Sequence, residues 1–215
     1  MLGELGQLAL CFALGLSLVM AVSGLLGARA DAPNSELRSE LARSIASAST
    51  MGMMVFVVLA FGVLLTGFVT SDFSIAVVAN NSHTLKPMIY KITGVWGNHE
   101  GSMLLWVLVL SLYAGAVAVM GRGGARLTSA ALGVQGLLAV AFLLFILFTS
   151  NPFLRLDPAP FEGAGLNPLL QDPGLAVHPP MLYAGYVGLS ASFSYAAAAL
   201  IVGEAGWARA ARPFM

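Results

Sequence analysis

The residues best suited to chemistry lie in two short segments, each placed just before a long apolar stretch. One segment reads Trp-Gly-Asn-His-Glu-Gly-Ser over residues 96–102, and the other reads His-Pro-Pro-Met-Leu-Tyr over residues 178–183. Imidazole is the side chain that most often binds metal ions in proteins. Because a residue before proline is pushed out of the helical region, we expect His178 to be extended and fixed by Pro179 and Pro180. The second segment therefore predicts a rigidly aimed metal ligand.

Both segments also have a purely structural interpretation. In the first, Trp96 is typical of the aromatic belt at a membrane surface, and the polar residues around His99 can cap the helix that follows. In the second, a single loop histidine more often supports the fold than binds a metal, and Tyr183 lies near the top of the next helix. The residues alone leave both alternatives open.

Several other kinds of chemistry are excluded. The chain has no glycine-rich phosphate loop, no His-Glu-x-x-His zinc motif and no Gly-x-Ser-x-Gly nucleophile turn. Its ten basic and ten acidic residues cancel, which removes the electrostatic basis for binding nucleic acid. The single cysteine, Cys11, excludes an internal disulfide, a Cys-x-x-Cys redox pair and covalent c-type haem attachment within this chain.

The elements that must position these segments are membrane-spanning helices. Hydrophobic residues make up 58% of the chain and charged residues only 9%, against about 25% charged residues in a soluble domain. Five windows contain no Asp, Glu, Lys or Arg and are close to the length of about 20 residues that crosses a bilayer. We therefore expect an all-α integral membrane protein with five transmembrane helices, forming one domain over residues 1–215. The windows are residues 8–26, 51–70, 102–120, 130–149 and 181–202.

The positive charges predict the orientation. The loops on one side carry seven arginines and are residues 27–49, 121–129 and 203–215. The two long loops on the other side, 71–101 and 150–180, carry two lysines and one arginine. Because basic residues concentrate on the cytoplasmic side, we expect the N-terminus and both long loops to lie outside. These external loops contain all three histidines, namely His83, His99 and His178.

Several loops have apolar residues at helical spacing. Loop 71–101 predicts an amphipathic helix that lies at the membrane interface, with Lys86 and Lys91 opposite its apolar face. That face consists of Leu85, Met88, Ile89, Ile92, Val95 and Trp96. In loop 27–49, Pro33 and Asn34 can begin a helix that runs into the second span. Its apolar stripe consists of Leu37, Leu41 and Ile45.

The remaining features predict packing. Loop 150–180 holds seven of the ten prolines, which predicts a stiff lid over the outer ends of the helices. In the fifth span, small residues recur every fourth position and predict a face that another helix can approach closely. These small residues are Ala184, Gly188, Ser192 and Ala196.

Longer runs around these segments resemble the CcmF family of cytochrome c-type biogenesis proteins, the haem lyases of the inner membrane. The resemblance extends along the whole chain, and several long motifs in order are far more specific than a single one. The runs are Trp-Gly-Asn-His-Glu-Gly-Ser-Met-Leu-Leu-Trp (96–106), Leu-Leu-Phe-Ile-Leu-Phe-Thr-Ser-Asn-Pro-Phe (143–153), Leu-Asn-Pro-Leu-Leu-Gln-Asp-Pro-Gly (166–174) and His-Pro-Pro-Met-Leu-Tyr-Ala-Gly-Tyr-Val-Gly (178–188).

The resemblance implies a function. Members of the family take haem from a periplasmic haem chaperone and attach it, through thioether bonds, to the Cys-x-x-Cys-His motif of apocytochrome c, which a thiol-redox partner presents. His178 matches the first of two external histidines that hold a non-covalent b-type haem, and it is expected to be an axial ligand of the iron. Trp96, His99 and Tyr183 are further candidate contacts. The implied location is the bacterial inner membrane with the haem side periplasmic, or alternatively the mitochondrial inner membrane.

The chain departs from the family pattern at one point. It lacks the tryptophan-rich loop, the second external histidine and the histidines within spans that the family's second haem requires. We therefore expect the N-terminal part of a larger lyase, which is inactive alone and whose small-residue face meets helices of the C-terminal part.

Two other functional classes remain open. A transporter usually has polar or broken helices near the membrane midplane, whereas these windows contain no charge and no proline. A non-catalytic scaffold of the maturation complex would use the external loops only to dock partner proteins. The sequence does not assign roles to His83, His99 and Glu100.

Overall fold

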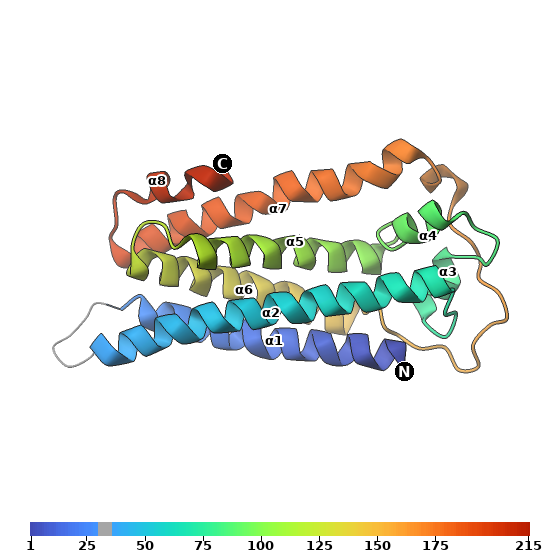
Figure 1. The fold of residues 1–215 in the computed structure, drawn as a ribbon, viewed down its shortest axis with the longest axis horizontal. Coiled ribbons are helices and arrows are strands. Elements are labelled where there is room, and N and C mark those ends of the chain that lie inside the picture. Colours follow the sequence, from blue (N-terminus) through green and yellow to red (C-terminus); the bar gives the residue numbers. More distant parts are fainter. Residues whose placement is uncertain (30–35) are drawn as a thin grey trace.

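The computed structural model describes residues 1–29 and 36–215 as an elongated bundle of helices (Figure 1). Five helices are long and apolar enough to cross a membrane. They are α1 (Leu2–Gly27), α2 (Glu36–Thr70), α5 (His99–Met120), α6 (Ala125–Thr149) and α7 (Pro173–Val202). Within the described residues there is no strand, and a single isolated β-bridge joins Ile75 and Arg155. The all-α fold with five spans is thereby confirmed.

The short elements sit at the two ends of the bundle. Helices α3 (Ala76–Asn81) and α4 (Met88–Gly94) and the 3₁₀ turn η1 (Pro168–Leu170) lie at the same end as the N-terminus. Helix α8 (Trp207–Ala211) and the turn η2 (Arg212–Phe214) lie at the opposite end and fold back along α7. The two groups of loops separated by their arginine content therefore lie at opposite ends, as the sequence predicted.

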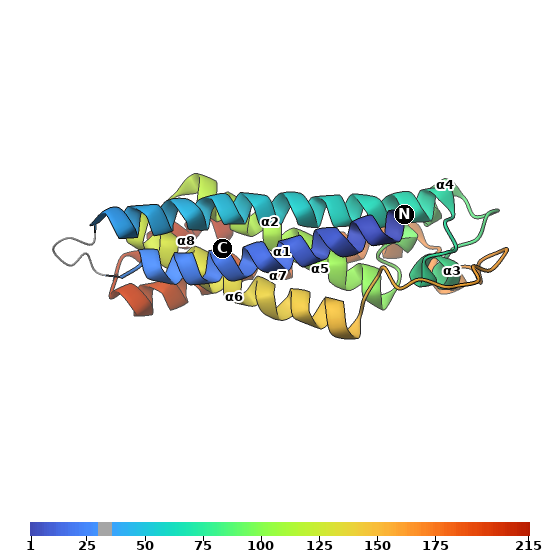
Figure 2. The ribbon, with the colours of Figure 1, turned by 90° about the horizontal axis from the view of Figure 1, so that it is seen from below.

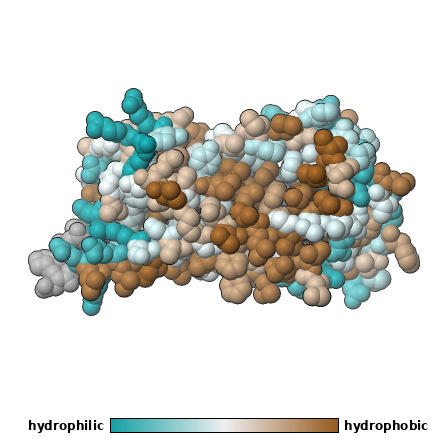
Figure 3. Space-filling model, in the orientation of Figure 1, coloured by the Kyte–Doolittle hydropathy of each residue, from teal (hydrophilic) through white to brown (hydrophobic). Residues whose placement is uncertain are grey.

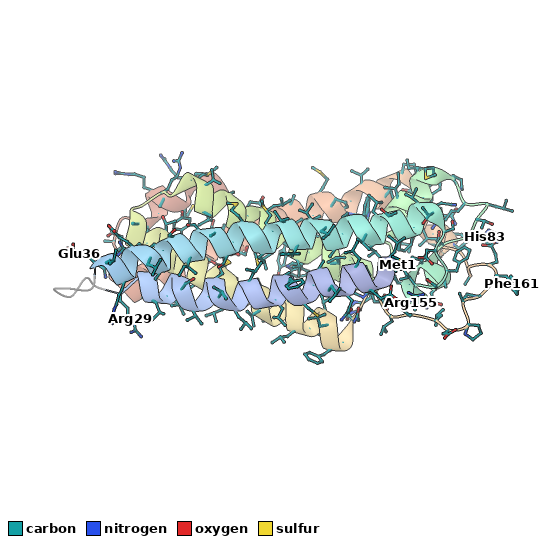
Figure 4. The ribbon with its side chains drawn as sticks, turned by 60° about the horizontal axis from the view of Figure 1, so that its bottom comes forward. Met1, Arg29, Glu36, His83, Arg155 and Phe161 are labelled. Atoms are coloured by element: carbon teal, nitrogen blue, oxygen red, sulfur yellow. The ribbon has the colours of Figure 1, made fainter. Side chains whose placement is uncertain are left out.

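A hydrophobic belt lies between these ends. Figure 3 shows brown, hydrophobic atoms across the middle of the molecule and teal, hydrophilic atoms concentrated toward the two ends. Met1, His83, Arg155 and Phe161 mark one end, and Arg29 and Glu36 mark the other (Figure 4). This arrangement fits a bundle that crosses a bilayer along its long axis.

Glycines allow α1 and α6 to pack closely. A side chain at Gly24 of α1 would lie 2.5 Å from the backbone nitrogen of Gly133 on α6, and one at Gly136 would lie 2.6 Å from the backbone nitrogen of Ala21. Helices α1 and α2 run side by side in both ribbon views (Figures 1 and 2). Since lipid offers no hydrophobic driving force between spans, such close backbone approach is how transmembrane helices gain contact.

The structure corrects the expected conformation of His178. Helix α7 begins at Pro173, so His178 is helical and not extended, and the second external loop ends at residue 172. Pro179 and Pro180 lie inside α7, so the fifth span does contain prolines near its outer end. They are the seventh and eighth residues of the helix, beyond the first four whose N–H groups lack intrahelical partners, so each removes a backbone hydrogen bond from α7.

The segment around α4 has the two predicted faces. Lys86 and Lys91 are buried, and their ammonium groups donate to the Asn81 carbonyl at 2.9 Å and to Ser71 Oγ at 2.8 Å. Burial, together with the charge of Lys91, lowers the pKa of Lys86 from 10.5 to about 8. The exposed apolar side chains are Leu85, Met88, Ile89 and Ile92, whereas Val95 is buried. That α4 lies at the membrane interface stays a prediction.

The small-residue face of α7 is used in part within the chain: Gly188 is buried, Ser192 and Ala196 are half-buried and Ala184 is exposed. That helices of a C-terminal part cover the rest of this face stays a prediction. A side chain at Gly188 would lie 2.6 Å from Tyr113 Oη of α5, and that hydroxyl donates to the Ala184 carbonyl at 2.8 Å. Ser192 Oγ donates to the Phe214 carbonyl of η2 at 2.8 Å. The apolar stripe of loop 27–49 lies on α2, whereas Pro33 and Asn34 fall outside the described residues.

Candidate functional site

The start of α5 is fixed by Asn98. Its Oδ1 accepts the Gly101 N–H at 2.7 Å, and its Nδ2 donates to the Gly94 carbonyl at 2.8 Å. The side chain therefore caps α5 and ties it to the end of α4. Gly101 has no room for a side chain, because an added Cβ would lie 1.6 Å from the Val95 carbonyl oxygen. The spacing of asparagine and glycine in this segment thus places His99 at the first position of α5.

His99 points toward the end of α6. Its Nε2 lies 2.7 Å from Ser150 Oγ, and its ring meets the Phe145 ring edge-on with centroids 6.3 Å apart. One ring nitrogen is therefore engaged in a hydrogen bond that joins α5 to the α6 terminus. Ser150 gave no signal in the sequence, because it lies 51 residues from its partner.

Trp96 completes a hydrogen bond that proline removes from α7. Pro180 has no N–H, so it cannot donate to the carbonyl four residues earlier, at Ala176. The indole Nε1 of Trp96 donates to that carbonyl at 2.8 Å. A side chain from the first external loop thereby replaces the hydrogen bond that Pro180 removes, which favours a helix that begins before the proline pair.

A cavity of about 410 Å³ lies beside these residues at the outer end. It is bordered by the end of α4, the start of α5, η1 and the first turns of α7, and Thr93 Oγ1 is buried there without a hydrogen-bond partner among the described residues. Trp96 and His99 share this cavity, as the sequence grouped them. Its lining residues are Thr93, Trp96, Gly97, Asn98, His99, Ser102, Leu170, Ala176 and Pro179.

Tyr183 packs just below the cavity. Its hydroxyl lies 2.7 Å from Ser102 Oγ on α5, and its ring lies 5.7 Å from that of Trp106. Trp106 also contacts Phe142 and Tyr186, with ring centroids 5.1 and 5.7 Å away. This aromatic cluster joins α5, α6 and α7. The sequence did not predict that Ser102 is the partner of the Tyr183 hydroxyl, because the two residues are 81 positions apart.

His178 lies on the other side of α7. Helical residues turn by about 100° each, so His178 lies about 200° from Ala176, which faces the cavity. Its side chain is exposed, as are Leu182 and Leu189, one and three turns further along the same face. The structure therefore brings Trp96, His99 and Tyr183 together and places His178 apart from them.

The second external loop is tied to the rest of the outer end. Thr84 donates to Glu162 through its backbone N–H at 2.9 Å and through its hydroxyl, and the hydroxyl bond is the largest cause that lowers the pKa of Glu162 to about 2. Arg155 pairs with Glu4 at the start of α1. His83 lies 3.9 Å from Glu162. His83 thus lies at this polar contact between the two external loops.

The stretch that builds this end matches a known family. The profile described as Cytochrome C assembly protein matches residues 96–210, from Trp96 through α7 to α8. The chain belongs to this family of multi-pass membrane proteins, which confirms the resemblance drawn from the motifs.

Individual relatives sharpen the assignment. The chain is 53% identical to the cytochrome c-type biogenesis protein ccl1 of Rhodobacter capsulatus over 219 residues, covering all of this chain and 32% of that protein. It is 45% identical to the cytochrome c-type biogenesis protein CcmF of Escherichia coli, again covering all of this chain and 33% of that protein. The chain thus spans about a third of the length of these relatives.

A solved structure has the same fold. The structure described as Cytochrome c Heme Lyase CcmF matches all of this chain and 33% of its own with a TM-score of 0.83 at 27% sequence identity. The arrangement of the five long helices is therefore similar to part of that protein.

Proposed function

We propose that this chain is the N-terminal part of a cytochrome c haem lyase and that His178 is an axial ligand of the haem iron in transit. The observation that carries the proposal is an exposed imidazole on the outer turns of α7 in a chain that belongs to the cytochrome c assembly family. An iron ligand needs a neutral ring nitrogen that the approaching metal can reach. Exposure of His178 meets that requirement.

The surroundings of His178 suit a porphyrin. Met181, Leu182 and Tyr186 are all exposed within two turns of it, so an apolar macrocycle bound at the imidazole would cover apolar surface. When bound, the haem supplies the vinyl groups to which cysteine thiols add. The protein residues hold it at the outer end, where an external partner can reach it. A second axial ligand would come from the part of the lyase outside this third.

Trp96, His99 and Tyr183 have a different role in this proposal. They lie on the side of α7 opposite to His178, and their polar atoms engage Ala176, Ser150 and Ser102. We infer that they fix the first turns of α7, and therefore the height of the His178 imidazole, without touching the same haem. This replaces direct haem contact by these three residues as the hypothesis to test.

The partners follow from the outer location. A haem chaperone would deliver haem to the end that carries the two external loops, and apocytochrome c with its thiol-redox partner would receive it there. The arginines at the opposite end support a periplasmic outer end in a bacterial inner membrane. Both loops are tied down through Glu162 and Arg155, which gives the partners a defined surface.

The direct experiment is His178→Ala in the full-length polypeptide, with His83→Ala as the matched control. His83 is another external histidine, but it lies beside Glu162. We expect His178→Ala to remove the haem absorbance band of the purified protein and to abolish formation of holocytochrome c, while His83→Ala retains both. Full haem content and full holocytochrome c in His178→Ala would contradict the proposal.

The same experiment separates the other classes. A scaffold would keep its haem content and lose binding of partner proteins, and a transporter would keep holocytochrome c formation when haem is supplied on the outer side. Restoration of the absorbance band by added imidazole in His178→Ala would identify the lost group as an iron ligand and not as a packing residue.

A further inference from the structure

A second hollow lies at the opposite end of the bundle, between α1 and α2. It is an open groove of about 510 Å³ whose lining is apolar except for Ser23 and Arg38. Ser23 Oγ donates to the Val19 carbonyl of its own helix at 2.6 Å, so it offers little polarity to the groove. The lining residues are Leu18, Val19, Val22, Ser23 and Leu26 of α1 and Arg38, Leu41, Ala42 and Ile45 of α2.

The length of the groove corresponds to one bilayer leaflet. From Leu18 to Leu26 the α1 wall rises about 12 Å at about 1.5 Å per residue, and half of a hydrocarbon core of about 30 Å is about 15 Å. Leu26 is the last residue of the first charge-free window, so the groove runs from within the leaflet to its surface. The apolar walls are exposed, with Val22 at 59% and Leu41 at 59%.

Arg38 stands at the surface end of this groove. It lies one turn before Leu41 and Ala42, on the side of them away from the charge-free window that begins at residue 51. Glu36 and Glu40 each lie two residues from Arg38 and therefore about 200° round α2, on its other side. Within residues 1–29 and 36–215, no carboxylate forms an ion pair with Arg38. Among the described residues, Arg38 is therefore the charged side chain that the groove offers to a ligand.

We propose that this groove binds one anionic phospholipid, with an acyl chain between α1 and α2 and the phosphate on the Arg38 guanidinium. The fork of guanidinium N–H donors matches phosphate oxygens, and the adjacent apolar walls match a single hydrocarbon chain. The groove and the lipid match in charge, because Arg38 faces the phosphate. They also match in length, because Arg38 lies at headgroup depth when the acyl chain fills the groove. The proposed haem-handling role plays no part in this inference.

The test is native mass spectrometry of the full-length polypeptide in detergent, titrated with phosphatidylglycerol and, separately, with phosphatidylcholine. We expect one tightly retained phosphatidylglycerol, and about fivefold weaker retention in Arg38→Gln, the effect of one basic residue at an anionic membrane surface. Arg209→Gln is the matched control. Arg209 is an exposed arginine of α8 at the same end that does not line the groove, so its substitution should leave retention unchanged.

Three results would overturn the proposal. The first is equal retention of phosphatidylglycerol by Arg38→Gln and the unsubstituted protein. The second is equal loss in Arg209→Gln, which would mean general attraction of the basic end. The third comes from a photoreactive benzophenone side chain in place of Val22, introduced in a native membrane. It should crosslink to lipid, and crosslinking to a polypeptide would mean that a helix or a second copy covers the groove.

Discussion

The two sides of α7 differ in whether their residues contact other helices. On the side toward α4 and α5, the Ala176 carbonyl, the Tyr183 hydroxyl and Gly188 each meet a specific partner in Trp96, Ser102 and Tyr113. On the outward side, His178, Leu182, Gly185 and Leu189 are exposed.

The packed side of α7 therefore holds the helix in place, whereas the outward side exposes His178. The packed side is over-determined, because several independent contacts fix the same turns of one helix. The outward side carries one side chain that can bind a metal, and it is held in place by contacts made behind it. Substitutions on the packed side should therefore change stability first, whereas those on the outward side should leave stability nearly unchanged and act on function alone.

The largest expected effect is that of Gly101→Ala. Its new Cβ would lie 1.6 Å from the Val95 carbonyl oxygen, so the start of α5 must move and the Asn98 cap is lost. We expect a loss of at least about 3 kcal/mol in the free energy of unfolding. The measurement is detergent-based unfolding of the purified protein, followed by tryptophan fluorescence.

Gly185→Ala is the control on the outward side. No atom lies within 4 Å of an added Cβ there, so the change should stay within about 0.5 kcal/mol. Similar losses in both variants would remove the distinction between the two sides.

The next effect concerns the buried ammonium group of Lys86, just before α4, and the dependence of the free energy of unfolding on pH. The pKa of Lys86 is lowered to about 8 from 10.5, so between these values the unfolded chain holds a proton that the folded chain has released. Stability should therefore rise with pH across this window, by about 1–3 kcal/mol at about 1.4 kcal/mol per pKa unit. The measurement is the same unfolding experiment repeated from pH 7 to 11.

Two variants isolate this contribution. In Lys86→Met the rise between pH 8 and 10.5 should disappear. In Lys91→Met the rise should begin at a higher pH, because the neighbouring charge that lowers the pKa of Lys86 is gone. An unchanged rise in Lys86→Met would show that another group titrates there.

Trp96→Phe removes one hydrogen bond from the packed side of α7, the bond from the indole to the Ala176 carbonyl. The ring is largely retained, but the Ala176 carbonyl loses its donor, which should cost about 1–2 kcal/mol. Amide hydrogen exchange over residues 173–183 is the sharper readout, since the first turns of α7 should open more often. If exchange rises equally in α6, the effect is not specific to the proline pair.

Tyr183→Phe is expected to have the smallest effect on the packed side, about 1 kcal/mol from the lost bond to Ser102. Leu182→Ala, its neighbour on the outward side, should change the free energy of unfolding by no more than about 0.5 kcal/mol. Both are read by the same unfolding measurement. A larger loss for Leu182→Ala than for Tyr183→Phe would mean that this face is packed in the isolated protein.

The sequence predicted the parts of the fold that depend on composition. Five windows without charge are sufficient to find the spans, because each buried charge is costly in lipid. The separation of the loops at the two ends also followed, because it depends only on the number of crossings. The Trp96 and His99 segment could be recognised as a unit, since Asn98 and Gly101 act within a few residues of each other.

The remaining features depend on packing between distant segments. The expectation that His178 is extended was wrong, since His178 lies inside α7. The donor that replaces the hydrogen bond lost at Pro180 is on Trp96, 80 residues from its acceptor, where no local rule about proline can find it. The buried ammonium of Lys86 likewise depends on a carbonyl at Asn81 that only the folded loop brings near. No local pattern identifies Ser150 as the partner of His99.

The bond from the Trp96 indole to the Ala176 carbonyl also bears on biosynthesis. The donor is translated 80 residues before the acceptor, an interval of roughly 4–16 s at about 5–20 residues per second. The ribosome thus releases the tryptophan well before the proline-containing turns need it. The first turns of α7 therefore meet a hydrogen-bond donor that has already been synthesised and can already be in place at the outer end.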